Sequence, residues 1–241
     1  KKMNKNEYVS SRLKDIDILV NEEQSQQLVR FYELMIEKNK VMNLTSITDF
    51  QEVVEKHFMD SLLVNHAVHF TGSESIIDVG TGAGFPGIPL KIIFPDLDLV
   101  LMDSVNKRLK FVDEVIEELN LKKIKTVHAR AEDMANQKEY RENFDYCLSR
   151  AVANLATLAE LCLPFVKVGG KFISYKAGEI ETEVSSSALA AKVLANSKWT
   201  VQYFNIPDTQ IQRSFVSCVK IKTTPKKYPR KAGLPGKEPI H

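Results

Sequence analysis

The feature that most constrains the fold is an alternation of apolar, strand-like runs with helical patterns, which begins after Gly72. When a helix links two strands that pair in parallel, the crossover is right-handed, and repeated crossovers build a mostly parallel sheet covered by helices. The sequence therefore predicts an α/β, Rossmann-like sheet of seven strands that binds its ligands at the carboxyl ends of the strands. We expect strands at about 75–79, 98–102, 124–128, 144–149, 170–175, 199–206 and 213–221, and helices near 86–94, 105–119, 154–163 and 180–195.

The two ends of the chain differ from this central part. The first 70 residues have a helical pattern, since Asn21 begins a capping box and a second helical start follows at 48–51. The last two predicted strands are separated only by the segment PDTQIQ and should form an antiparallel terminal hairpin on the sheet. The predicted division is a small N-terminal helical appendage at 1–70, a sheet domain at 71–222 and a basic C-terminal tail at 223–241.

Composition limits the possible classes of protein. No apolar run approaches the ~20 residues that a membrane helix needs, and the polar opening lacks the apolar stretch of a signal peptide. We therefore expect a cytoplasmic protein with no membrane partner. The three cysteines, Cys147, Cys162 and Cys218, stand among apolar neighbours, which favours buried free thiols over a disulfide framework or a metal site.

A glycine loop follows the first predicted strand. The segment DVGTGAGFPG contains Gly80, Gly82 and Gly84, and its last six residues have the G-x-G-x-x-G spacing that both NAD and S-adenosylmethionine sites use. Asp78 precedes the loop, and a carboxylate there suits the ammonium of S-adenosylmethionine better than a pyrophosphate. Pro86 removes one N–H group that a pyrophosphate would need. The loop therefore favours a cofactor without phosphates.

Three further strand ends carry polar residues suited to the same ligand. Asp103 ends the second strand, about 20 residues after the loop, where an acid accepts hydrogen bonds from both ribose hydroxyls; a helix cap is the alternative. Glu132 follows the third strand, where the adenine would lie. Arg150 follows the fourth, where its cation could pair with the methionine carboxylate or with a phosphate. Together with Asp78, these residues predict a nucleoside-type cofactor site.

Several motifs beyond the glycine loop carry a family resemblance across nearly the whole chain. They read NLTSIT, KHFMDSL, DVGTGAGFPGIPL, DSVNKR, RAED, SRAVANL and TPKKYPRKAGLPGKEPI. In these motifs the chain resembles the glucose-inhibited division protein B family, which are S-adenosylmethionine-dependent methyltransferases of guanine N7 in bacterial 16S ribosomal RNA. The resemblance implies a methyltransferase sheet, a partner that is 16S ribosomal RNA or the assembling small ribosomal subunit, and cofactor contacts at Gly80, Phe85, Ala131, Glu132 and Arg150.

The chemistry that the chain lacks agrees with guanine N7 as the target. An amine substrate calls for an Asn/Asp-Pro-Pro-aromatic stretch after the fourth strand, where this chain has Ser149-Arg150-Ala151-Val152. N7 carries a lone pair and no proton, so we expect direct in-line attack with no general base and no metal. Arg150, Asn43 and Lys176 are the candidates for positioning the guanine, although Asn43 could instead cap a helix and Lys176 could be a solvated strand end. His57 and Asp60 are expected to be structural.

The C-terminal tail is strongly basic. Residues 219–241 contain seven Lys and Arg against one acid, Glu238, while the whole chain carries a formal charge of +2. Pro and Gly residues predict an irregular segment, either a solvated terminus or an RNA-binding one in which cations neutralise phosphates and a tyrosine stacks on a base. The candidate RNA-binding residues are Lys226, Lys227, Tyr228, Arg230 and Lys231.

Three other functions remain open from the sequence. The same sheet would serve a methyltransferase of a small molecule or a protein, and only the basic tail and the family resemblance argue against it. An NAD-dependent oxidoreductase is weakened by Asp78, by Pro86 and by the absence of a Tyr-x-x-x-Lys pair. A non-enzymatic RNA-binding module would have no use for the cofactor residues.

Overall fold

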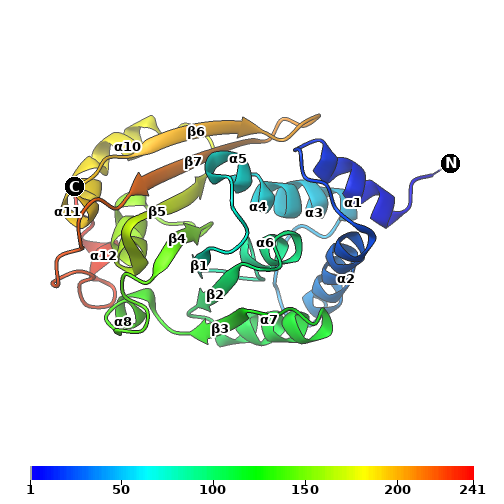
Figure 1. The fold of residues 1–241 in the computed structure, drawn as a ribbon, viewed down its shortest axis with the longest axis horizontal. Coiled ribbons are helices and arrows are strands. Elements are labelled where there is room, and N and C mark those ends of the chain that lie inside the picture. The colour runs from blue at the N-terminus through cyan, green and yellow to red at the C-terminus, as the bar shows by residue number, and fades with distance from the viewer. Residues whose placement is uncertain (1) are drawn as a thin grey trace.

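The computed structural model describes residues 2–241 and places seven strands in one sheet, in the order β3-β2-β1-β4-β5-β7-β6 (Figure 1). The first five strands run in parallel, and β7 is antiparallel to both of its neighbours, as predicted for the terminal hairpin. The strands are β1 (Ser75–Val79), β2 (Asp98–Asp103), β3 (Ile124–His128), β4 (Phe144–Ser149), β5 (Val166–Lys176), β6 (Thr200–Asn205) and β7 (Gln212–Val219).

The order of the strands reverses at β1, which pairs with β2 on one side and with β4 on the other. Loops that leave β1 and β4 at their carboxyl ends diverge there, and such a point is where open α/β sheets bind ligands. β5 begins four residues earlier than predicted, because a register shift near Phe144 and Tyr146 absorbs Gly169 and Gly170 within the strand.

The helices predicted between the strands are present, and the structure adds a short helix after β3 and a 3₁₀ turn before β5. The predicted helix at 180–195 is divided at Ser187, whose backbone leaves helical geometry and whose carbonyl accepts a hydrogen bond from the Trp199 indole at 2.9 Å. The connecting helices are α6 (Gly87–Ile93), α7 (Asn106–Glu118), α8 (Ala131–Met134), α9 (Leu155–Cys162), the 3₁₀ turn η2 (Leu163–Phe165), α10 (Glu181–Ser186) and α11 (Ala188–Ala195).

The first 70 residues form a helical layer. Asn21 caps α2 through the predicted capping box, and Asp49 caps the next helix. A six-residue π-helix, η1, interrupts this layer, and π-turns of this kind occur frequently at functional sites. The elements are α1 (Lys5–Lys14), α2 (Glu22–Asn39), α3 (Phe50–Val53), η1 (Val54–Met59), α4 (Asp60–Leu62) and α5 (Val64–Val68).

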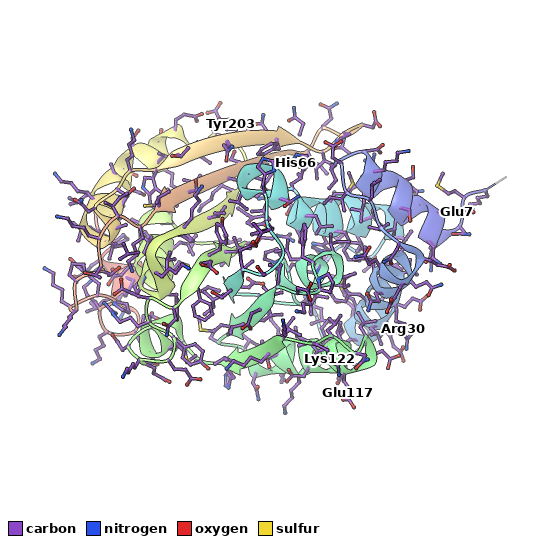
Figure 2. The ribbon with its side chains drawn as sticks, in the orientation of Figure 1. Glu7, Arg30, His66, Glu117, Lys122 and Tyr203 are labelled. Atoms are coloured by element: carbon purple, nitrogen blue, oxygen red, sulfur yellow. The ribbon has the colours of Figure 1, made fainter. Side chains whose placement is uncertain are left out.

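Two apolar cores hold the layers together. The N-terminal helices pack with α6 and α7 on one face of the sheet, where Phe31, Phe58 and Phe111 are fully buried (Figure 1). Figure 2 shows His66 on α5 close to the outer strands, where its ring lies 5.9 Å from that of Phe204. The N-terminal helices therefore share their core with the sheet.

The opposite face is covered by α8, α9, α11 and the C-terminal segment. The thiols of Cys147, Cys162 and Cys218 are free and buried in this layer, as predicted. Residues 222–241 form irregular chain and one short helix, α12 (Leu234–Lys237), and they pack against the domain instead of projecting from it. Among residues 2–241, no helix combines the length and apolar character that a bilayer crossing requires.

Candidate active site

Three neighbouring cavities lie around the carboxyl ends of β1 and β4. Cavity A, of about 650 Å³, extends over the ends of β1, β2 and β3, and cavity B, of about 160 Å³, lies over the glycine loop. Cavity C, of about 700 Å³, lies beside β5. Gly80 lines both A and B, Arg150 lines both B and C, and Ala151 lines both A and C. The junction of the three cavities therefore lies at the ends of β1 and β4.

The glycine loop has the backbone geometry that its composition predicts. Gly80 has a φ of 76°, and a Cβ atom at this position would lie 3.0 Å from the Cβ of Ala151. Gly82 and Gly84 also have positive φ, at 59° and 104°, in the region that glycine adopts readily. Side chains at these positions would strain the loop and, at Gly80, press against the wall shared by A and C.

Asp78 lies beneath this loop and does not line any of the three cavities. Its Oδ2 accepts hydrogen bonds from the Thr81 hydroxyl at 2.7 Å and from the Gly87 N–H at 3.0 Å. Burial raises the pKa of this carboxyl to about 7, and those two hydrogen bonds oppose the rise. In the structure Asp78 therefore holds the glycine loop, and its expected contact with the cofactor stays a prediction. Its Oδ1 remains buried without a hydrogen-bond partner.

Asp103 and Glu132 line cavity A from two strand ends. Asp103 accepts the Gly82 N–H at 2.8 Å through one oxygen and the Val105 N–H at 2.9 Å through the other. It therefore ties the glycine loop to β2 and holds the turn before α7. The alternative interpretation as a helix cap is wrong, because Val105 occupies the N-cap position of α7 and no side chain caps that helix. Ala131 and Glu132 follow β3 on the same wall, and Glu132 accepts the Gly233 N–H at 3.2 Å.

Arg150 is held by the N-terminal helical layer. Its Nη1 donates to the Ser61 hydroxyl at 3.1 Å, and its Nε lies 3.2 Å from Asp60 Oδ2, an ion pair without hydrogen-bond alignment. The guanidinium carbon lies 5.5 Å from the centre of the Phe85 ring, a cation–π distance. Sequence reasoning placed Arg150 at the site but did not foresee that residues 56–61 fix its orientation.

His57 is part of the same arrangement. Its ring stacks on Phe85 with the centroids 4.6 Å apart, and its Nδ1 faces the Arg150 Nη2 at 3.4 Å. Burial, aided by the charge of Arg150, lowers the pKa of His57 to about 3, so the ring is neutral. Nδ1 then accepts from Arg150, and Nε2 donates to the Thr45 hydroxyl at 3.1 Å.

Thr45 lines cavity B and was not among the predicted site residues. Its oxygen accepts from His57 and from the Ile47 N–H at 3.0 Å, which leaves its own hydroxyl hydrogen free to donate. Asn43, two residues earlier, is exposed and does not line any of the three cavities. The cap in this connection comes instead from Asn39, whose Oδ1 accepts the N–H groups of Leu44 and Thr45.

Asp60 is 1% exposed and lies between two arginines. Besides Arg150, it contacts the Nε of Arg213 on β7 at 2.5 Å. The neighbouring Tyr175 on β5 donates to the Ser61 carbonyl at 2.7 Å, and its ring lies 5.8 Å from the Arg213 guanidinium. Because the π-helix η1 and the start of α4 present His57, Asp60 and Ser61 to Arg150, these residues belong to the site's framework.

Lys176 lies in cavity C, at the end of β5. Its ammonium contacts the Ala153 carbonyl at 2.6 Å and Glu183 at 2.8 Å. The structure thus brings Lys176 and Arg150 to one cavity, with Lys176 in an ion pair and not freely solvated. No group of three or more His, Cys, Asp or Glu side chains in the described part of the chain is arranged to hold a metal ion.

The proposed RNA-binding residues of the C-terminal segment separate into two groups. Lys226, Lys227 and Lys231 are exposed, and Lys227 lies over the Tyr228 ring at 5.2 Å. Arg230 differs from these lysines, because its guanidinium forms a two-pronged ion pair with the fully buried Glu160, at 2.8 Å between Nη2 and Oε2. A phosphate would have to compete with Glu160 for this cation, and RNA binding by Arg230 stays a prediction.

Comparison with known proteins agrees with this geometry. Residues 24–215 match the GidB family model, described as rRNA small subunit methyltransferase G. A relative from Lachnoclostridium phytofermentans with the name Ribosomal RNA small subunit methyltransferase G is 46% identical over 228 residues, which cover 95% of this chain and 94% of that protein.

Solved structures with similar folds have much lower sequence identity. A SAM-dependent O-methyltransferase of Thermotoga maritima superimposes with a TM-score of 0.50 at 14% identity, covering 77% of this chain and 71% of that one. M. jannaschii TYW2 in complex with AdoMet has a TM-score of 0.50 at 15% identity, covering 66% and 74%. These similarities concern the fold, whereas the family match concerns the sequence over most of the chain. The chain therefore belongs to the GidB family, rRNA small subunit methyltransferase G.

Proposed function

We propose that this protein transfers a methyl group from S-adenosylmethionine to N7 of a guanine in 16S ribosomal RNA, by direct in-line attack of N7 on the methyl group. The observation that carries the proposal is the meeting of cavity A with cavity C at Ala151, beside Arg150. A cofactor in A and a base in C would approach each other there. The family match supports the RNA class of the substrate.

The residues of cavity A fit S-adenosylmethionine. Its volume of about 650 Å³ falls within the range of small-molecule sites, and Asp103 offers the carboxylate that a ribose needs. The unpartnered Oδ1 of Asp78 is an acceptor suited to an ammonium near the loop. Gly80, which lines both A and B, would contact the methionine part together with Gly82 and Phe85 of cavity B, and Ala131 with Glu132 would contact the adenine side. Gly84 lines neither cavity and would act through the turn of the loop. When bound, this cofactor supplies a methyl group activated by a sulfonium.

Arg150 and Lys176 are suited to orient the guanine. A bidentate Arg would cover both O6 and N7 and block the reacting atom, so donors that offer a single hydrogen are preferable. Asp60, Ser61 and His57 already engage most of the N–H groups of Arg150, which leaves few free to donate. Thr45 adds a hydroxyl hydrogen in cavity B. Asn43 is a weaker candidate than Thr45, because it is outside the cavities.

The reaction places no demand on a general base. N7 of guanine carries no proton, and the catalytic contribution of the chain is orientation, which can supply roughly 7–11 kcal/mol in well-aligned systems. The neutral His57 has both ring nitrogens in hydrogen bonds, which agrees with a positioning role. The partner would be 16S ribosomal RNA or the assembling small subunit, in the cytoplasm, with Lys226, Lys227, Lys231 and Tyr228 contacting it.

The test combines labelled S-adenosylmethionine with naked small-subunit RNA, assembled subunits, total RNA and a mixture of cell proteins. N7-methylguanosine carries a fixed positive charge, so borohydride followed by aniline should cleave the product at one site. Nucleoside digestion and mass spectrometry should give that nucleoside alone. Label in a protein or small-molecule fraction would favour the alternative methyltransferase, and an N2- or O6-methylated guanine would refute attack by N7.

A further inference from the structure

Two arginines line the cavity proposed for the cofactor without any evident partner. Arg108, in the first turn of α7, and Arg130, directly before α8, both line cavity A and are both exposed. Within residues 2–241, neither guanidinium forms an ion pair or a side-chain hydrogen bond. They differ in this from the other arginines of the site, Arg150 and Arg213, which share Asp60.

The cofactor does not account for these two charges. S-adenosylmethionine has no phosphate, and its sulfonium and ammonium groups together outweigh its single carboxylate. Two further cations at the mouth of its cavity therefore oppose its binding. Asp103 and Glu132 line the same cavity, but their carboxylates accept backbone N–H groups and are not paired with either arginine.

Folding does not account for them either. The first turn of α7 contains no acidic residue and carries Lys107 and Arg108, although the amino end of a helix carries partial positive charge and favours anions. Cations there destabilise the folded chain. These two unpaired cations are unfavourable for binding the cofactor and for the amino end of α7. They are suited instead to an anionic partner that binds from outside the chain.

We propose that Arg108 and Arg130 bind phosphates of the RNA backbone at the mouth of cavity A, so that the bound RNA crosses over the cofactor. This inference rests on the proposed function, because it takes the substrate to be RNA. The two residues follow β2 and β3, two adjacent strands, and both line cavity A; we call this pair the cationic rim. A polyanion is favoured over a free phosphate because each phosphate that is neutralised also releases condensed counterions.

The rim also differs in kind from the C-terminal lysines. Lys226, Lys227 and Lys231 do not line cavity A, although their segment reaches its wall where Gly233 donates to Glu132. Arg108 and Arg130 line the cavity itself. Contacts at the rim would therefore place the RNA backbone over the adenine side of the cofactor, next to Ala131 and Glu132. Such contacts position the RNA and do not read its sequence.

The test uses the full chain with Arg108→Ala/Arg130→Ala as the variant and Arg108→Lys/Arg130→Lys as the control that keeps the charge. RNA affinity is measured by fluorescence anisotropy between low and high salt, and S-adenosylmethionine affinity by calorimetry. Loss of two phosphate contacts to single-stranded RNA should flatten the slope of log K against log salt by about 1.4, equivalent to roughly 25-fold weaker binding at 0.1 M salt. Cofactor affinity should stay unchanged or rise.

Two results would overturn the inference. An unchanged salt slope in the alanine variant would show that the arginines do not meet phosphates. Loss of cofactor affinity with intact RNA binding would show that they hold the cofactor. Failure of the proposed function is distinguishable from both, since the unmodified protein would then fail to bind RNA or to form N7-methylguanosine.

Discussion

Asp60→Asn is the substitution that tests the framework of the site most directly. It preserves the shape of a side chain that is 1% exposed and removes the charge that faces Arg150 at 3.2 Å and Arg213 at 2.5 Å. Breaking a buried ion pair on one side costs about 3–5 kcal/mol, because the remaining charge loses its partner. Both arginine side chains are 17% exposed, so water compensates in part, and we expect about 3 kcal/mol.

The assay is thermal unfolding combined with steady-state kinetics. For a chain of this size, 1 kcal/mol corresponds to about 2–4 °C in Tm, so Tm should fall by roughly 6–12 °C. The control is Arg30→Gln, which breaks an ion pair with Glu118 whose two side chains are 43% and 47% exposed, and its cost should stay below about 1 kcal/mol.

Measurements of kcat/KM separate the effect of Asp60→Asn on the orientation of Arg150 from its effect on stability. At a temperature where Asp60→Asn is fully folded, kcat/KM should fall, because the Arg150 guanidinium has lost its fixed orientation. In an Arg150→Gln background, the same Asp60 substitution should cause little further loss, since it acts through Arg150. Equal losses in both backgrounds, or a Tm as high as that of the unmodified chain, would refute this account of the site.

Three further outcomes follow from the same geometry. The pKa of Asp78 is raised from 3.8 to about 7 in the folded chain, so the folded state retains a proton that the unfolded state loses. This carboxyl therefore makes the free energy of unfolding fall as pH rises from about 4 to 7. Asp78→Asn should flatten that part of the profile of Tm against pH. Glu160→Gln removes the buried partner of Arg230 and should lower the free energy of unfolding by about 3 kcal/mol or more in a denaturant titration, whereas unchanged stability would mean that the C-terminal segment is not fastened there. S-adenosylmethionine at a hundredfold excess over Kd should stabilise the protein by about 2.7 kcal/mol in thermal unfolding, and NAD should not; equal stabilisation by NAD would contradict the interpretation of the glycine loop.

Much of the fold could be predicted because its signals are local. Alternating apolar runs determine the strands, and capping residues such as Asn21 and Asp49 determine where helices begin. The division of the predicted helix at Ser187 depends on a contact with Trp199, and no local pattern announces it. The early start of β5 likewise depends on how its glycines pair with β4.

The residues of the site likewise separate into those with a local sequence signal and those placed by tertiary contacts. Asp103, Glu132 and Arg150 could be found because they follow strands, and parallel strands bring their carboxyl ends together. Thr45 was missed, and His57 was expected to be structural without its contact to Arg150, because both depend on how the N-terminal helices pack on the sheet. The partner of Arg230 lies 70 positions earlier in the chain, and charge patterning within the basic segment could not reveal it.

The place of β7 in the sheet has a consequence for biosynthesis. β7 is the last strand to leave the ribosome, yet it lies between β5 and β6, so β6 has no pairing partner until Val219 has emerged. Phe215 and Val216 belong to the two different apolar cores, and both cores therefore stay open during most of translation. Until β7 pairs, the nascent chain exposes strand edges and apolar surface, and exposed surface of this kind is prone to aggregation.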